Sequence, residues 1–161
     1  IASAKSYHEL ATSKIADAKA VLSQAEDALA MDSSRLKDAE DAFERAKSDL
    51  SQQLPRERNA AAKVLEVQEA VKAAHAKTSG LRAELESSDL SSWERREKEA
   101  SLYQLEAASS SVKADCRAAE LEAMGMARKK AELETEVAAA KGRLLDASKK
   151  VAESKAGIRR A

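Results

Sequence analysis

The chain has 161 residues, of which 35% are charged and only 2% are aromatic, and it contains four glycines and one proline. Such a composition is typical of long helices or coiled coils and supplies too few aromatic side chains for a broad globular core. The 28 basic and 28 acidic residues balance, and no apolar run approaches the roughly 18 residues that span a bilayer. We therefore do not expect nucleic acid or a membrane to be the main partner.

Bulky apolar residues recur every seven positions through the first third of the chain, and a mostly small residue follows each of them after three positions. This spacing predicts a coiled-coil seam, the stripe of heptad positions a and d along which one helix packs on another. The bulky seam residues of this part are Leu22, Leu29, Leu36, Phe43 and Leu50, preceded by Ile15.

Pro55 lies beyond this repeat, on an outward-facing f position, and the apolar pattern resumes after it in the same phase with Val64, Val71 and Leu81. A continuous helix must preserve phase, whereas a turn need not. We therefore predict one helix over about 3–88 with a kink near Pro55. The alternative is a turn at Pro55, which would give a three-helix antiparallel bundle.

Serine and aspartate cluster at 87–92, where we predict a turn. Ser91 and Glu94 have the spacing of a capping box, which marks the start of a helix. A second helix is predicted over about 92–160. Its bulky seam residues are Leu102, Val112, Leu133, Val137, Leu144, Val151 and Ile158.

Two long helices joined by a short turn must lie antiparallel if they pack on each other. The sequence therefore predicts an all-α fold, an elongated antiparallel two-helix coiled-coil hairpin that forms a single coiled-coil segment over 1–161. One register places Phe43 opposite Ala140 and Leu36 opposite Ala147, so that large residues face small ones at many layers, while Leu50 meets Leu133. A register slipped by one heptad stays open, and so does the question of whether residues 1–21 pair with anything.

Charge favours the same arrangement. Residues 1–50 carry 7 basic and 10 acidic groups, whereas residues 127–161 carry 10 basic and 5 acidic groups. A hairpin brings these two segments side by side. Surface ion pairs are individually weak, so this observation adds only modest support.

Two surface features are candidate binding sites. Trp93 is predicted at the hairpin tip with Leu90, Arg95 and Arg96, and exposed tryptophan and arginine are frequent hot spots of binding. The competing interpretation, which we favour, is that Trp93 folds over the end of the seam and covers it. The basic residues at 128–130 could contact a phosphate backbone or an acidic filament, but acidic neighbours favour ordinary solvated charge. These residues are Arg128, Lys129 and Lys130.

The sequence offers no constellation for catalysis or for metal binding. His8 and His75 are far apart and neither has a second ligand one helical turn away. Cys116 occupies an a position, where we expect a small buried apolar residue. A two-helix seam provides no cleft to perturb the abundant carboxylates. We therefore expect no enzyme activity, no cofactor and no small-molecule substrate.

The leading hypothesis is a non-catalytic coiled-coil scaffold, spacer or self-association segment of a larger protein, since the chain begins at Ile1. Its partners would be proteins, including a second copy in a homodimer. One alternative is a binding module that presents the hairpin tip or the basic residues to a protein filament, nucleic acid or membrane. Another is a helical segment of a secreted bacterial effector or toxin. The compartment is left open, with an intracellular, cytoplasmic location favoured. Heptads occur in many unrelated proteins, so no family is assigned.

Overall fold

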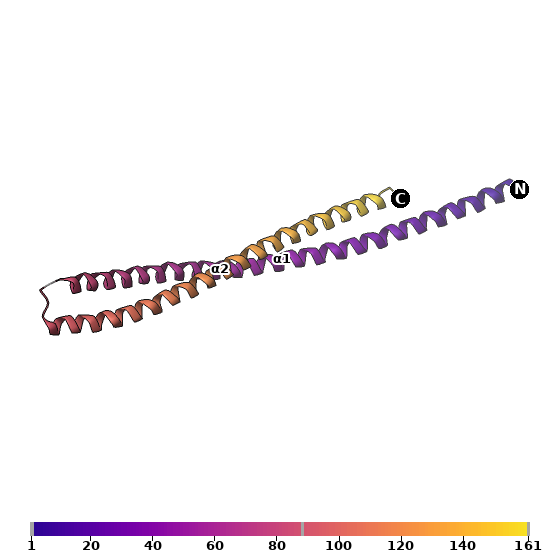
Figure 1. Cartoon of the computed structure of the whole chain (residues 1–161). Coiled ribbons are helices and arrows are strands. Elements are labelled where there is room, and N and C mark those ends of the chain that lie inside the picture. Colours follow the sequence, from indigo (N-terminus) through magenta and orange to yellow (C-terminus); the bar gives the residue numbers. More distant parts are fainter. Residues whose placement is uncertain (1, 88, 161) are drawn as a thin grey trace. The chain divides into compact units, whose positions relative to one another are not determined.

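The computed structural model describes residues 2–87 and 89–160, with side chains from residue 6 onward. Helix α1 spans Ala2–Glu86 and helix α2 spans Ser92–Ile158 (Figure 1). The two helices pack against each other, and no strand occurs in the described part of the chain. The prediction of an all-α two-helix hairpin is confirmed.

Pro55 lies inside α1, which continues as helix on both sides of it. The three-helix alternative with a turn at this residue is therefore wrong. Proline removes one backbone donor, and on an exposed f position its ring meets solvent, so the packed face of the helix is kept. The kink that we expect here stays a prediction.

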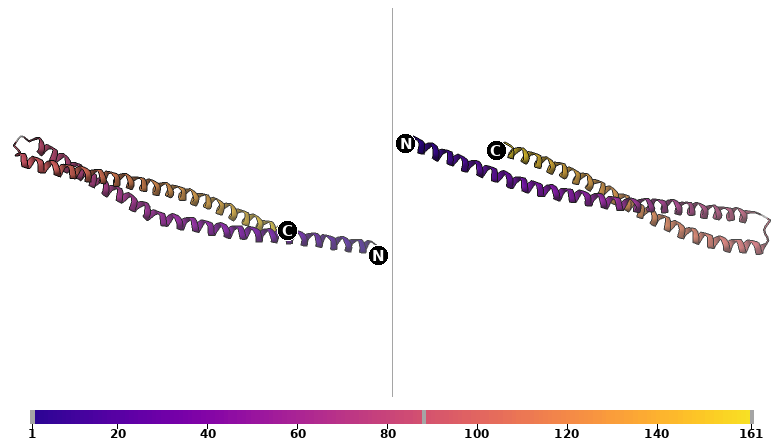
Figure 2. Two further views of the ribbon diagram at one scale, coloured as in Figure 1. Left: turned by 60° about the horizontal axis from the view of Figure 1, so that its bottom comes forward. Right: turned by 180° about the vertical axis from the view of Figure 1, so that it is seen from behind.

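The chain divides into two compact units, each built from one stretch of α1 and one of α2. Unit 1 comprises Ile1–Leu50 and Leu133–Ala161, and unit 2 comprises Ser51–Glu132. In each unit the two helical stretches run antiparallel (Figures 1 and 2).

Burial follows the heptad positions through both units. Buried and half-buried residues recur at alternating steps of three and four from Ala25 to Leu85 on α1 and from Lys98 to Ile158 on α2. Among the described residues, those that are buried all occupy a or d positions: Ala46, Gln53, Ala60, Thr78, Ser109, Ala119, Ala140 and Val151. Most are small, so the core is a narrow stripe between the helices.

Charged and polar residues beside the seam of unit 2 define which layers face each other. Lys63 Nζ lies 3.1 Å from Glu122 Oε2, and Arg82 pairs with Glu106. These contacts fit the register that places Phe43 opposite Ala140. A slip of one heptad would move the members of each pair apart by about 10 Å along the helix axes.

A polar layer interrupts the seam of unit 2. The Gln53 side chain is 2% exposed, and its amide donates to the Met126 carbonyl oxygen at 3.2 Å. One turn away, Lys130 Nζ lies 3.4 Å from Glu57 Oε2, with the two side chains 30% and 27% exposed. The buried amide and the half-buried charges thus all have partners, as burial of polar groups requires.

Candidate interaction surfaces

The start of α2 is fixed by a reciprocal hydrogen-bonded cap. The Ser91 backbone N–H donates to Glu94 Oε2 at 2.8 Å, the Ser91 hydroxyl donates to the same oxygen at 2.6 Å, and the Glu94 N–H donates to Ser91 Oγ at 3.3 Å. This is the capping box that the sequence predicts. The side-chain and then the backbone hydrogen bond from Ser91 lower the pKa of Glu94, and the charge of Lys98 adds to this shift.

The hairpin tip presents the largest side chain of the protein to solvent. Trp93 is 70% exposed, and Leu90 is half-buried, while Arg95 and Arg96 are exposed. The favoured interpretation, in which Trp93 covers the end of the seam, is therefore wrong. As the third residue of the capping box, Trp93 lies between two residues whose cap fixes the first turn, and its side chain points off the seam.

The basic residues at 128–130 are largely engaged with acidic neighbours. Arg128 Nε lies 3.2 Å from Glu132 Oε1 on the same helix, and Lys130 pairs across the seam with Glu57. Lys129 is exposed. Two of the three charges are thus offset locally, which weakens any attraction for a phosphate backbone.

The seam residues named from the sequence lie along the helix–helix contact, except near the N-terminus of α1. Val151 is buried, and the others from Leu29 to Ile158 are half-buried. Leu22 is 38% exposed and Ile15 is 57% exposed. The first part of the α1 heptad pattern therefore has no packed partner among the described residues.

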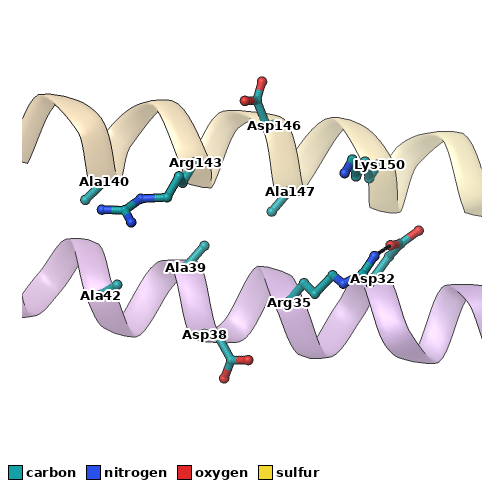
Figure 3. Close-up of a pocket in the computed structure, with 10 residues that line it drawn as sticks. All are labelled: Asp32, Arg35, Asp38, Ala39, Ala42, Ala140, Arg143, Asp146, Ala147 and Lys150. Carbon is teal, nitrogen blue, oxygen red and sulfur yellow. Dashed lines mark hydrogen bonds and ion pairs between the residues drawn. The ribbon is translucent and has the colours of Figure 1, made fainter.

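A groove of about 410 Å³ lies between α1 and α2 in unit 1 (Figure 3). Arg143 extends between the two helices, while Asp38 and Asp146 point away from the gap. Three acidic and three basic residues line the groove, so its charge favours neither an anion nor a cation. The apolar part of its lining consists of alanines, Ala39, Ala42, Ala140 and Ala147.

This groove was not foreseen from the sequence. It forms because Ala42 occupies the g position beside the seam, where most layers carry a longer side chain. At one end, Asp32 on a seam d position accepts a hydrogen bond from Ser154 at 2.6 Å and pairs with Arg35 at 3.4 Å. Alanine at a g position, adjoining alanines at d, was the signal available in the sequence.

Cys116 is half-buried on α2, with Sγ 3.7 Å from Glu120 Oε1. Burial raises the pKa of its thiol, and the charge and hydrogen bond of Glu120 raise it further. A thiol in such surroundings is a weaker nucleophile at neutral pH than a free cysteine. In the part of the chain that the structure describes, no three His, Cys, Asp or Glu side chains gather as a metal site would need.

No protein-family model matches the chain, and comparison with curated proteins and with solved structures likewise finds no match. Over their described residues, neither α1 nor α2 contains a stretch that is apolar enough for long enough to cross a membrane.

Proposed function

We propose that this chain is a non-catalytic coiled-coil scaffold or spacer within a larger protein. The observation that carries the proposal is the continuous run of seam contacts, from Ala25 to Leu85 on α1 and from Lys98 to Ile158 on α2. An α-helix rises 1.5 Å per residue, so the 85 residues of α1 follow a path of about 130 Å. The paired part of α1, from Ala25 to Leu85, would act as a spacer between the segments attached to its two ends.

The chemistry of the surfaces supports a mechanical role. The shifted pKa values of Glu94 and Cys116 have local causes, a helix cap and partial burial. Neither group lines the groove of unit 1. Catalysis would need perturbed groups gathered around a substrate cavity.

Spin labels test whether the seam holds in solution. Lys47 and Lys141 are exposed residues that flank the layer of Phe43 and Ala140 in unit 1, so cysteines placed there leave the seam intact. In a Cys116→Ser background with an excess of unlabelled protein, we expect a separation of about 20 Å or less by double electron–electron resonance. A separation of several tens of ångströms would show that the helices are unpaired and would rule out the scaffold.

A second candidate function is recognition of a protein partner by the tip, which the exposure of Trp93 favours. Trp93 is the only tryptophan, so its fluorescence reports directly on contacts at the tip. Trp93→Ala combined with Arg95→Ala should abolish recovery of a tip-bound partner in a pull-down. Tyr103→Ala is the matched control, because Tyr103 is a 75% exposed aromatic residue elsewhere on α2. Unchanged recovery with the tip variant would exclude this function.

A further inference from the structure

The N-terminal part of α1 continues the seam without a packing partner among the residues that the structure describes. Residues 6–24, here called the N-terminal extension, are exposed at every position, and they project beyond the end of α2 (Figure 2). Ala25, at the next seam position, is half-buried, as is Ile158 near the end of α2. The helix–helix contact thus stops where α2 stops, while the a and d pattern of α1 goes on through Ile15 and Ala18.

We propose that the N-terminal extension pairs antiparallel with the same segment of a second copy of this chain. The inference rests on the proposed scaffold function, since it supplies the scaffold with a self-association site. Its basis is continuity: the exposed stripe is the direct prolongation of a stripe that is packed against a helix in the rest of unit 1. Ile15, at an a position, is 57% exposed, although the bulky a residues of α1 from Leu29 onward are half-buried.

The phase of the heptads allows a self-pairing that covers the whole extension. Antiparallel helices place a positions opposite d positions, so the possible registers differ by whole heptads. One of them sets Ile15 opposite Ala11 of the second copy and Ala18 opposite His8 of the second copy. The extension of each copy then lies along the full extension of the other. Large side chains again face small ones, as they do where Phe43 faces Ala140.

The packed seam of unit 2 shows which residues meet beside an antiparallel layer, and the same spacing can be applied to the layers of the extension. In unit 2 the layer of Ala60 and Ala123 is flanked by the pair of Lys63 and Glu122, with Nζ and Oε2 3.1 Å apart. Lys63 follows Ala60 by three positions, and Glu122 precedes Ala123 by one. Residues with these offsets therefore meet on one side of an antiparallel seam.

Applied to the layer of Ala18 and His8, the same offsets bring Val21 opposite Tyr7 of the second copy. Both are apolar and solvent-exposed in the single chain, Tyr7 by 73% and Val21 by 55%. By symmetry this contact forms twice. The register thus covers two large apolar side chains beside the seam that lack a packing partner in the single chain. Lys14 meets its own copy at the two-fold axis, where long lysine side chains can diverge into solvent.

The extension is already helical before it pairs. An isolated helix of this length is marginal in water, because its first turn is costly to nucleate. Here the helix propagates from the paired part of α1, so the second copy does not have to supply that nucleation. Few heptads are involved, and we expect a reversible dimer that dissociates on dilution.

The first test compares two substitutions in the same segment of the full chain. Ile15→Lys places a charge on the proposed interface, whereas Leu10→Lys places it on a c position that faces away from it. Both residues are exposed in the single chain, by 57% and 54%, so neither change should disturb the hairpin. In sedimentation equilibrium, Ile15→Lys should weaken the dimer at least about 100-fold, because each dimer contains Ile15 twice. Leu10→Lys should change it less than about threefold.

The second test measures register. With Ser23→Cys in a Cys116→Ser background, the proposed pairing puts two spin labels about 30 Å apart. A parallel pairing would bring the labels almost together, and a slip of one heptad would change their separation by about 10 Å. Either result would overturn the register.

A monomer at all concentrations would overturn the proposal and leave the extension to another partner. A dimer that withstands Ile15→Lys would overturn it as well, by placing the interface elsewhere. The intramolecular distance between labels at Lys47 and Lys141 distinguishes failure of the dimer from failure of the scaffold. If that distance stays short while no dimer forms, self-association fails and the scaffold proposal stands.

Discussion

Replacing Glu57 by glutamine removes the negative charge beside Lys130 while keeping the size of the side chain. Glu57 Oε2 and Lys130 Nζ are 3.4 Å apart, and the two side chains are only 27% and 30% exposed. Lys130 occupies an a position, so its ammonium group would keep limited access to water after the substitution. Glu57→Gln should therefore destabilise the hairpin.

The size of the effect follows from two opposing contributions. Two unit charges at 3.4 Å attract each other by about 5 kcal/mol at an effective dielectric constant near 20. Loss of hydration when both groups enter the seam offsets most of that attraction. We expect a net loss of about 1–2 kcal/mol in the free energy of unfolding. Glu122→Gln should cost less than about 1 kcal/mol, because the pair of Lys63 and Glu122 is 58% and 48% exposed.

Urea unfolding followed by far-ultraviolet circular dichroism measures both losses. The two substitutions are chemically identical and both lie in unit 2, so Glu122→Gln is the matched control. Combining them with Lys130→Met and Lys63→Met closes two double-mutant cycles that isolate the coupling energy of each pair. An equal or smaller coupling for Glu57 and Lys130 would refute the idea that the seam restricts their hydration.

Three further predictions concern single positions. Pro55→Ala restores a backbone donor inside α1 and should raise the free energy of unfolding, measured in urea, by up to about 3 kcal/mol. An unchanged free energy of unfolding would show that Pro55 does not destabilise the helix. The lowered pKa of Glu94 means that its cap on α2 is fully present above the ordinary value of 4.5 and is lost as the pH falls through the folded-state pKa. An NMR titration of the Glu94 carboxyl group checks this, and Ser91→Ala should bring its midpoint back toward the ordinary value. The raised pKa of the Cys116 thiol predicts slow alkylation by iodoacetamide at neutral pH, and Glu120→Gln should accelerate it by lowering that pKa; an unchanged rate would contradict the influence of Glu120.

The architecture could be predicted from the sequence because the packing of a coiled coil follows a simple repeat of seven residues. The phase that continues from Leu50 through Val64 indicated that Pro55 lies within a helix, and the structure keeps α1 helical there. The spacing of Ser91 and Glu94 likewise indicated where α2 begins, and the hydrogen bonds of the cap are formed. Both inferences depend on the position of residues along a helix, which heptad spacing and capping rules determine.

Features that depend on side-chain direction were less accessible. The sequence places Trp93 at the tip, but its exposure to solvent depends on the direction in which the first turn of α2 projects the side chain. The groove beside Ala42 and Ala140 depends on how Arg143 and its neighbours extend along the flank of the seam. The heptad pattern gives only a partial signal for either feature, since heptads specify the buried stripe and leave the flanks variable.

The polar residues within the seam have a different role from its apolar layers. Because many layers pair a large residue with alanine, a slip of one heptad would still place large side chains opposite small ones at several levels. The polar layers do not survive such a slip. Lys130 would lose the carboxylate of Glu57, 3.4 Å from its Nζ, and Asp32 would lose the hydroxyl of Ser154 that now lies 2.6 Å from its carboxylate. A buried polar group without its partner costs about 1–3 kcal/mol, so each polar layer that loses its partner disfavours the slipped register. In an alanine-rich seam, the few polar layers therefore select the register, and the apolar layers supply the affinity between the helices.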